Sequence, residues 1–87
     1  MVDENPNYEK AVFNIAAINY DLYNFDETVL YYEKVIKINP KNDRAYYGLA
    51  AAEYARKNFT KSQTYCNKAL EINPDHQLAK DLLEWFK

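Results

Sequence analysis

The chain has 87 residues, of which 48% are hydrophobic and 28% are charged, a balance typical of one globular unit rather than a disordered segment. Its formal net charge of −2 gives no basic field for a phosphate backbone, and no segment approaches the ~18 apolar residues of a membrane helix, so we expect neither nucleic acid nor membrane as a partner. The polar N-terminus does not resemble a signal peptide, and the single cysteine favours a reducing, cytoplasmic location.

A first helix is predicted over residues 8–22. Apolar side chains recur there at helical spacing, and a second apolar stripe runs beside the first. The first stripe comprises Val12, Ile15, Ala16 and Leu22, and the second comprises Phe13, Ala17 and Tyr20. Asn7 is the expected N-cap, and Asn24 is expected to adopt the left-handed conformation that ends the helix.

A second helix is predicted over residues 26–38, with Asp26 as its N-terminal cap. It ends at Asn39-Pro40, because proline lacks the amide that a continuing helix needs and clashes with the preceding turn. Its inward positions are Thr28, Tyr32, Val35 and Ile36.

The same pattern then occurs again. A third helix starts at Asn42 or Asp43 and reaches about Arg56, and a fourth extends to about Ile72, with Thr60 and Gln63 as its capping box. A fifth helix over residues 76–86 carries a wide apolar stripe, formed by Leu78, Ala79, Leu82, Leu83, Trp85 and Phe86. The short connections between these segments predict antiparallel neighbours.

A fixed period explains this repetition. Three prolines, at positions 6, 40 and 74, lie 34 residues apart, and each follows an asparagine. Residues 9–42 align with 43–76 without a gap, and identical pairs include Ala16/Ala50, Asn24/Asn58 and Asn39/Asn73. A spacing repeated at one fixed period indicates a repeat array.

The pattern resembles the tetratricopeptide repeat (TPR) family. The opening motif is present as Val12-x2-Ile15-Ala16 and Tyr46-x2-Leu49-Ala50, the middle motif as Thr28-x3-Tyr32 and Ser62-x3-Cys66, and the closing prolines as Pro40 and Pro74. Small residues at Ala16/Ala50 and Thr28/Ser62 fit positions where the two helices of a pair cross most closely.

The resemblance implies an all-α, right-handed superhelical stack of antiparallel helix pairs with five helices. We therefore expect a single TPR domain over residues 1–87. Repeat one covers 9–42, repeat two covers 43–76, a capping helix covers 77–87, and residues 1–8 resemble the end of a preceding repeat.

The sequence departs from the family at one position. Asn19 and Glu53 stand where the family has tyrosine, and tyrosine follows one residue later. Either the helix is regular with a polar residue near the core, which we favour, or the turn is one residue short. The Glu53 carboxylate is expected to reach solvent or Arg56, and a hydrogen bond to Asn19 is the alternative.

No catalytic constellation is recognisable. His76 is expected to be an exposed turn residue, and Cys66 to be a buried small side chain rather than a nucleophile. One histidine and one cysteine do not make a metal site without positioned acidic partners. We therefore expect no enzyme activity, no cofactor and no metal.

The resemblance implies that the first helix of each repeat lines a concave groove for partner segments. Aromatic side chains with basic neighbours would suit a peptide that ends in an acidic group or a carboxylate. The alternative is that the tyrosines only cover the edges of the core. The candidate groove residues are Lys10, Phe13, Asn14, Tyr20, Arg44, Tyr47 and Tyr54.

One known binding mode of the family is disfavoured. The clamp for the C-terminal tails of heat-shock chaperones requires asparagine and basic residues at defined positions. The corresponding positions here hold Phe13, Ala17, Gly48, Leu78 and Leu82. The identity of the protein or peptide partner therefore stays open.

The predicted function is that of a protein-interaction module or scaffold. A structural role is the alternative: a self-associating assembly fragment of a longer array. Ala79, Leu83 and Phe86 should turn inward, which leaves an adjoining apolar stripe for a weak homodimer, formed by Leu78, Leu82 and Trp85.

Overall fold

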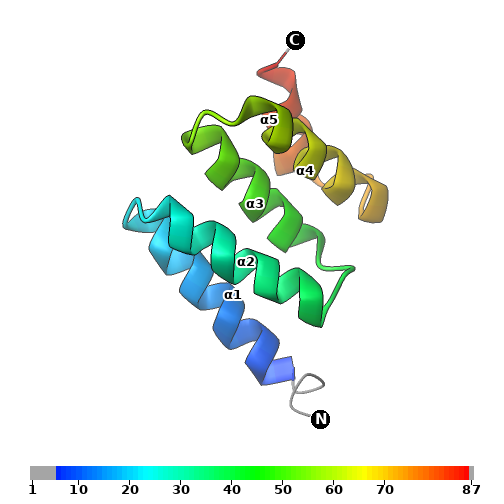
Figure 1. Ribbon diagram of the computed structural model, residues 1–87. Helices are drawn as coiled ribbons and strands as arrows, with labels where there is room; N and C mark the ends of the chain where they lie inside the picture. Colours follow the sequence, from blue (N-terminus) through cyan, green and yellow to red (C-terminus); the bar gives the residue numbers. More distant parts are fainter. Residues whose placement is uncertain (1–5, 87) are drawn as a thin grey trace.

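The computed structural model describes residues 6–86, which form five α-helices and no strand (Figure 1). The helices are α1 (Pro6–Asp21), α2 (Phe25–Ile38), α3 (Asp43–Ala55), α4 (Phe59–Ile72) and α5 (Gln77–Glu84). The prediction of an all-α chain with five helices is confirmed. The expectation that residues 1–8 resemble the end of a repeat falls mostly on residues 1–5, which lie outside the described part of the chain.

The helices form a staircase of antiparallel neighbours. The chain runs up α1, back along α2, up α3 and back along α4, and α5 then lies against the end of the stack (Figure 1). The described part measures 43 × 28 × 17 Å along its principal axes. Each helix therefore contacts the next one in sequence, and the predicted stack of helix pairs is confirmed.

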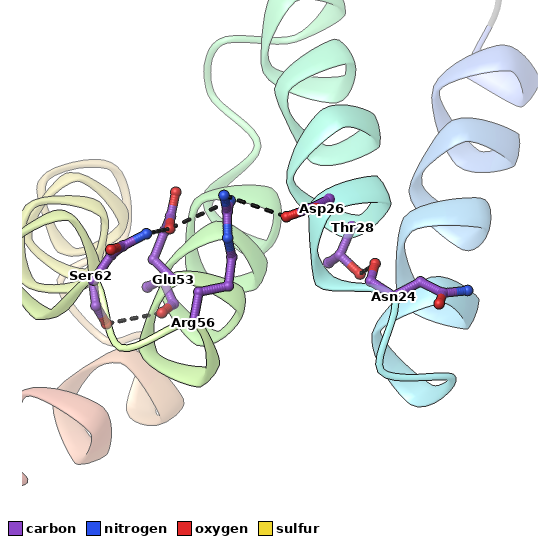
Figure 2. A network of polar contacts seen from close by, with 8 residues as sticks. Asn24, Asp26, Thr28, Glu53, Arg56 and Ser62 are labelled. Carbon is purple, nitrogen blue, oxygen red and sulfur yellow. Dashed lines mark hydrogen bonds and ion pairs between the residues drawn. The ribbon is translucent and has the colours of Figure 1, made fainter.

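Small residues lie where the helices cross most closely. Ala16, Thr28, Ala50 and Ser62 have no exposed surface, as their small size predicts. The hydroxyl of Ser62 donates a hydrogen bond of 2.8 Å to the carbonyl oxygen of Ala50, which joins α4 to α3 (Figure 2). The apolar cluster around the first pair and α3 contains Val12, Val29, Tyr32, Val35, Ala45, Leu49 and Ala52.

Two residues of the predicted core stripe of α1 are outside the core. Ile15 is 41% exposed and Leu22 is 62% exposed, whereas Val12 and Ala16 are buried. The helix turns only the Val12–Ala16 side toward α2. The prediction was therefore wrong for the other half of the stripe, which is an exposed apolar surface.

The predicted helix caps need correction. The left-handed residues are Tyr23 (φ 64°) and Lys57 (φ 67°), not the asparagines that follow them. Asn24 and Asn58 are instead the N-cap residues of α2 and α4, without a capping hydrogen bond from their side chains. Asp26, Thr60 and Gln63 lie inside these helices, so the predicted caps there do not form.

The start of α1 also differs from the prediction. The helix begins at Pro6, a residue whose fixed φ suits the first turn, so Asn7 lies inside the helix. The start of α3 agrees with the sequence, because the side chain of Asn42 accepts a hydrogen bond of 3.0 Å from the amide of Ala45.

Glu53 lies inside the fold with its charge compensated. Its side chain is 2% exposed and accepts a hydrogen bond of 2.8 Å from Asn58, and Arg56 approaches it to 3.6 Å (Figure 2). Arg56 also lies 3.3 Å from Asp26 on α2, which connects the two pairs. The helix is regular around a buried polar residue, as favoured, and the pairing with Arg56 is confirmed.

Asn19 does not contact Glu53. It donates to the carbonyl oxygen of Ile15 at 2.9 Å and accepts from Asn24 at 3.3 Å. In the first helix pair, Asn19 and Asn24 thus occupy the positions that Glu53 and Asn58 occupy in the second pair. The polar residues close the turn of their own pair rather than joining neighbouring repeats, so the predicted alternative is wrong.

Candidate interaction surface

The first helices of the two pairs, α1 and α3, share one side of the stack, where a hollow of about 280 Å³ opens between them and the start of α5. The α1 residues Phe13, Ala17, Tyr20 and Asp21 form one wall. The α3 residues Arg44, Tyr47, Gly48 and Ala51 form the other. Aromatic rings separated by small residues therefore enclose the hollow, as the helical positions predict.

The floor of the hollow depends on a close approach between α2 and α3. The ring of Tyr32 packs on Gly48, the one glycine of the chain. A Cβ atom at Gly48 would lie 2.8 Å from Cδ2 of Tyr32 and closer still to Cε2 and Cζ, which real side chains do not tolerate. Glycine therefore lets the Tyr32 ring fill the space below the groove.

One wall of the hollow is joined to the other through Phe13. Its ring meets Tyr32 edge-on, with centroids 5.2 Å apart, and the guanidinium of Arg44 lies 5.0 Å from its centroid. Such a cation–π contact is attractive because the ring face carries partial negative charge. Arg44 is nonetheless exposed, so its charge stays accessible at the edge of the hollow.

His76 lies at the end of the hollow and is buried, against expectation. It is 9% exposed, and its Nδ1 atom accepts the amide of Ala79 at 3.3 Å as the N-cap of α5. Its Nε2 atom lies 3.7 Å from the Asp43 carboxylate, and its ring stacks against Tyr47 with centroids 5.4 Å apart. A sequence signal existed, because His76 lies 34 residues after Asn42, the N-cap of α3.

Tyr20 and Tyr54 occupy equivalent positions but different surroundings. Tyr20 is 37% exposed, lines the hollow and packs edge-on against Phe25. Tyr54 is 39% exposed and packs against Phe59 in the same way. The ring of Phe86, which follows α5, also packs against Tyr54, with ring centroids 5.8 Å apart. Tyr54 is not among the residues that line the hollow.

The remaining candidates lie beside the hollow. Lys10 and Asn14 line a neighbouring depression of about 310 Å³ together with Phe13 and Arg44. The structure thus brings Phe13, Tyr20, Arg44 and Tyr47 together at one hollow and places Lys10 and Asn14 next to it.

Burial acts on two tyrosine hydroxyl groups of the hollow, those of Tyr32 and Tyr47. Desolvation raises the pKa of Tyr32 and of Tyr47 above the ordinary tyrosine value. Both phenols are therefore hydroxyl groups at neutral pH, able to donate and accept hydrogen bonds.

Cys66 is inside the fold. It has no exposed surface, and burial raises the pKa of its thiol to about 11. A thiol that stays protonated at neutral pH is a poor nucleophile, in agreement with the interpretation of Cys66 as a core residue.

Within residues 6–86, no group of three or more histidine, cysteine, aspartate or glutamate side chains is arranged to hold a metal ion. No helix in the same span is long and apolar enough to cross a membrane.

The C-terminal helix leaves part of its apolar surface uncovered. Leu78 is 56% exposed and Trp85 is 75% exposed, whereas Leu82 is half-buried. Ala79 is fully buried, and Phe86 packs on Tyr54 and Phe59. Ala79 is thus buried and Leu78 and Trp85 are exposed, as the sequence predicts, whereas Leu82 and Leu83, expected on opposite sides, are both half-buried. Leu78 also reaches the end of the hollow.

Comparison with known families gives one match. A sequence model described as tetratricopeptide repeat matches residues 19–85, most of the chain. No curated protein matches the sequence.

Proposed function

Since this chain belongs to the tetratricopeptide repeat family, whose members usually mediate protein–protein interactions, we propose that it is a non-catalytic module that binds a segment of a partner protein in the hollow between α1 and α3. The observation that carries the proposal is the hollow itself, which is lined by aromatic rings and bordered by the exposed Arg44.

The dimensions of the hollow favour a peptide side chain over a small metabolite. Its volume of about 280 Å³ lies at the lower limit of the usual range of small-molecule pockets, roughly 300–1,000 Å³. It has room for one large side chain of a longer segment, whose flanks would lie along α1 and α3. Rigid aromatic residues bury much surface at low entropic cost, which is why they recur as anchors in interfaces.

The chemistry of the rim favours an acidic or carboxylate-ended segment. Arg44 supplies an accessible cation, and Lys10 supplies another in the adjoining depression. Tyr32 and Tyr47 offer neutral hydroxyl groups, and burial raises the pKa of both further above the neutral range. An extended segment with one apolar anchor and a neighbouring carboxylate matches this arrangement.

The test is selection of a ligand from a peptide library, followed by calorimetry with variants. Tyr20→Ala and Tyr47→Ala should each weaken the selected peptide by about 1–2 kcal/mol, because each removes an aromatic wall. Lys10→Ala and Arg44→Ala should mainly slow association and reduce its salt dependence. Tyr23→Ala is the matched control, since Tyr23 is 80% exposed and lies outside the hollow.

Two results would contradict the proposal. One is a selected peptide that binds equally well to the Tyr20 and Tyr47 variants. The other is a peptide that loses affinity with Tyr23→Ala instead. Circular dichroism of each variant separates lost binding from lost folding.

We also propose that the chain divides into repeats at 9–42 and 43–76 with a capping helix at 77–87, and that it acts as a scaffold in the cytoplasm. The second candidate function, self-assembly as part of a longer array, is favoured by the exposure of Leu78 and Trp85. Light scattering over a range of concentrations tests it.

A further inference from the structure

Among residues 6–86, no helix covers an apolar stripe on the outer face of α1. Its members are Tyr8 (45% exposed), Ile15 (41%), Ile18 (57%) and Leu22 (62%), together with the exposed Ala11. None of the proposed groove residues belongs to this stripe.

The chain itself shows how such a face is normally covered. The residues 34 positions after Ala11, Ile15 and Ile18 are Ala45, Leu49 and Ala52. All three are completely buried on α3, in one cluster with Val29 and Val35 of α2. The same face of the same type of helix is therefore a helix-packing surface in one repeat and bare in the other.

We propose that the α1 stripe binds the α1 stripe of a second copy, antiparallel, and forms a symmetric dimer. The spacing of Ala11, Ile15, Ile18 and Leu22 alternates four and three residues, as in the seam of a two-helix coiled coil. An antiparallel register that sets Ile15 against Ile18 of the second copy also sets Ala11 against Leu22. At each end of the interface a small Ala11 then faces a large Leu22, and in the centre Ile15 of each copy meets Ile18 of the other.

The electrostatics of the face permit two copies to approach. No charged residue lies in the stripe, and the residues beside its centre, Asn14 and Asn19, are neutral amides.

The area sets the strength. The exposed side chains of the stripe amount to roughly 400 Å² per chain, the size of patch that marks an interaction site. Two such patches bury roughly 800 Å², less than the roughly 1,200 Å² of a stable complex. The dimer is therefore expected to be weak.

The first experiment is sedimentation equilibrium from micromolar to millimolar concentration. The mean mass should rise from 10.3 kDa toward twice that value, with little dependence on salt. Ile18→Lys should weaken dimerisation at least tenfold. Leu30→Lys is the matched control, because Leu30 is 45% exposed on α2 and should leave the dimer unchanged. Leu78→Lys tests the rival face on α5.

A crosslinking experiment tests the register. Ala11→Cys and Leu22→Cys are made in separate chains, each with Cys66→Ala so that no other thiol is present. Under mild oxidation, the mixture should form disulfide-linked dimers, whereas either chain alone should not, since the antiparallel arrangement holds like positions about 16 Å apart.

Several outcomes would overturn the proposal. They are a monomer at millimolar concentration, a dimer that survives Ile18→Lys, a dimer lost on Leu78→Lys, or crosslinking of Ala11→Cys with itself. Growth beyond a dimer would also overturn it, because a symmetric interface closes after two copies.

Discussion

The contact between Gly48 and Tyr32 gives the sharpest stability prediction, because two known effects oppose each other there. Replacing glycine by alanine inside a helix normally stabilises by about 1 kcal/mol. At Gly48 the new methyl group would overlap the buried ring of Tyr32, which is 6% exposed and held edge-on by Phe13. Overpacking of a core costs about 1–3 kcal/mol. The Gly48→Ala variant should therefore be less stable by up to about 2 kcal/mol.

A double variant tests whether the Tyr32 ring causes the expected loss of stability. In a Tyr32→Leu background the ring atoms that meet the Cβ are gone, so Gly48→Ala should become stabilising by up to about 1 kcal/mol. Urea denaturation measures both changes. The exposed Asn67 in the middle of α4 provides the reference, since Asn67→Ala compared with Asn67→Gly gives the propensity difference without a packing change.

The chain contains an internal indication that the pair is coupled. The residues 34 positions after Tyr32 and Gly48 are Cys66 and Leu82, so the large and small members exchange places in the next repeat. An increase in stability for Gly48→Ala in the natural background, equal to that at Asn67, would refute the steric argument.

Two further predictions concern Cys66 and α5. Because burial raises the pKa of the Cys66 thiol from 9.0 to about 11, its contribution to stability is present below about pH 9 and lost as the pH rises toward 11. Cys66→Ala should therefore reduce the fall of the urea midpoint between about pH 9 and 11, and an unchanged slope of the midpoint against pH would contradict this. Deletion of residues 77–87 removes the contacts of Ala79 and Phe86, so the free energy of unfolding should fall by several kcal/mol, at about 1.5–3 kcal/mol per large buried side chain, and the urea midpoint should fall with it. A shortened chain that unfolds at the same midpoint would show that α5 is not a cap.

The sequence predicted the helices well because their boundaries have strong local causes. The prolines at 40 and 74 and the asparagines before them end α2 and α4 where expected. The period also located the small residues at the helix crossings, such as Ala16 and Ser62, since a bulky side chain there would separate the helices.

The turns were harder to predict, because side chains outside the turn decide them. Asparagine is a common left-handed residue, but Asn24 and Asn58 instead donate to Asn19 and Glu53. This fixes the asparagine at the N-cap and moves the left-handed conformation to the preceding residue. Neither Tyr23 nor Lys57 has a propensity that would reveal it.

The candidate groove was predictable in its walls and not in its ends. Helical spacing alone brings Phe13, Tyr20 and Tyr47 to one side of the stack. The position of Tyr54 depends on where Phe86 folds, after the end of α5, and the pattern of α3 contains no information about that contact. His76 was misjudged because histidine in a turn is usually exposed.

The polar contacts explain why asparagines recur in the 34-residue period. Asn39 donates to Glu9 at 3.1 Å, and Asn73 donates to Asp43 at 3.0 Å, so each pair is closed at the end opposite its turn. The acceptors lie in the first turn of α1 and α3, where a carboxylate also interacts favourably with the helix dipole.

These closures also connect each pair to the helix that follows. Glu9 accepts a second hydrogen bond from Asn42, the N-cap of α3, at 2.8 Å, and Asp43 faces His76, the N-cap of α5, at 3.7 Å. At the second junction, the His76 ring also stacks on Tyr47. The residues that close the second repeat therefore hold a proposed anchor of the groove in place. A side chain that is held in place before binding loses little entropy on binding. Loss of the contact between Asp43 and His76 should therefore also weaken the binding of a segment that packs against Tyr47.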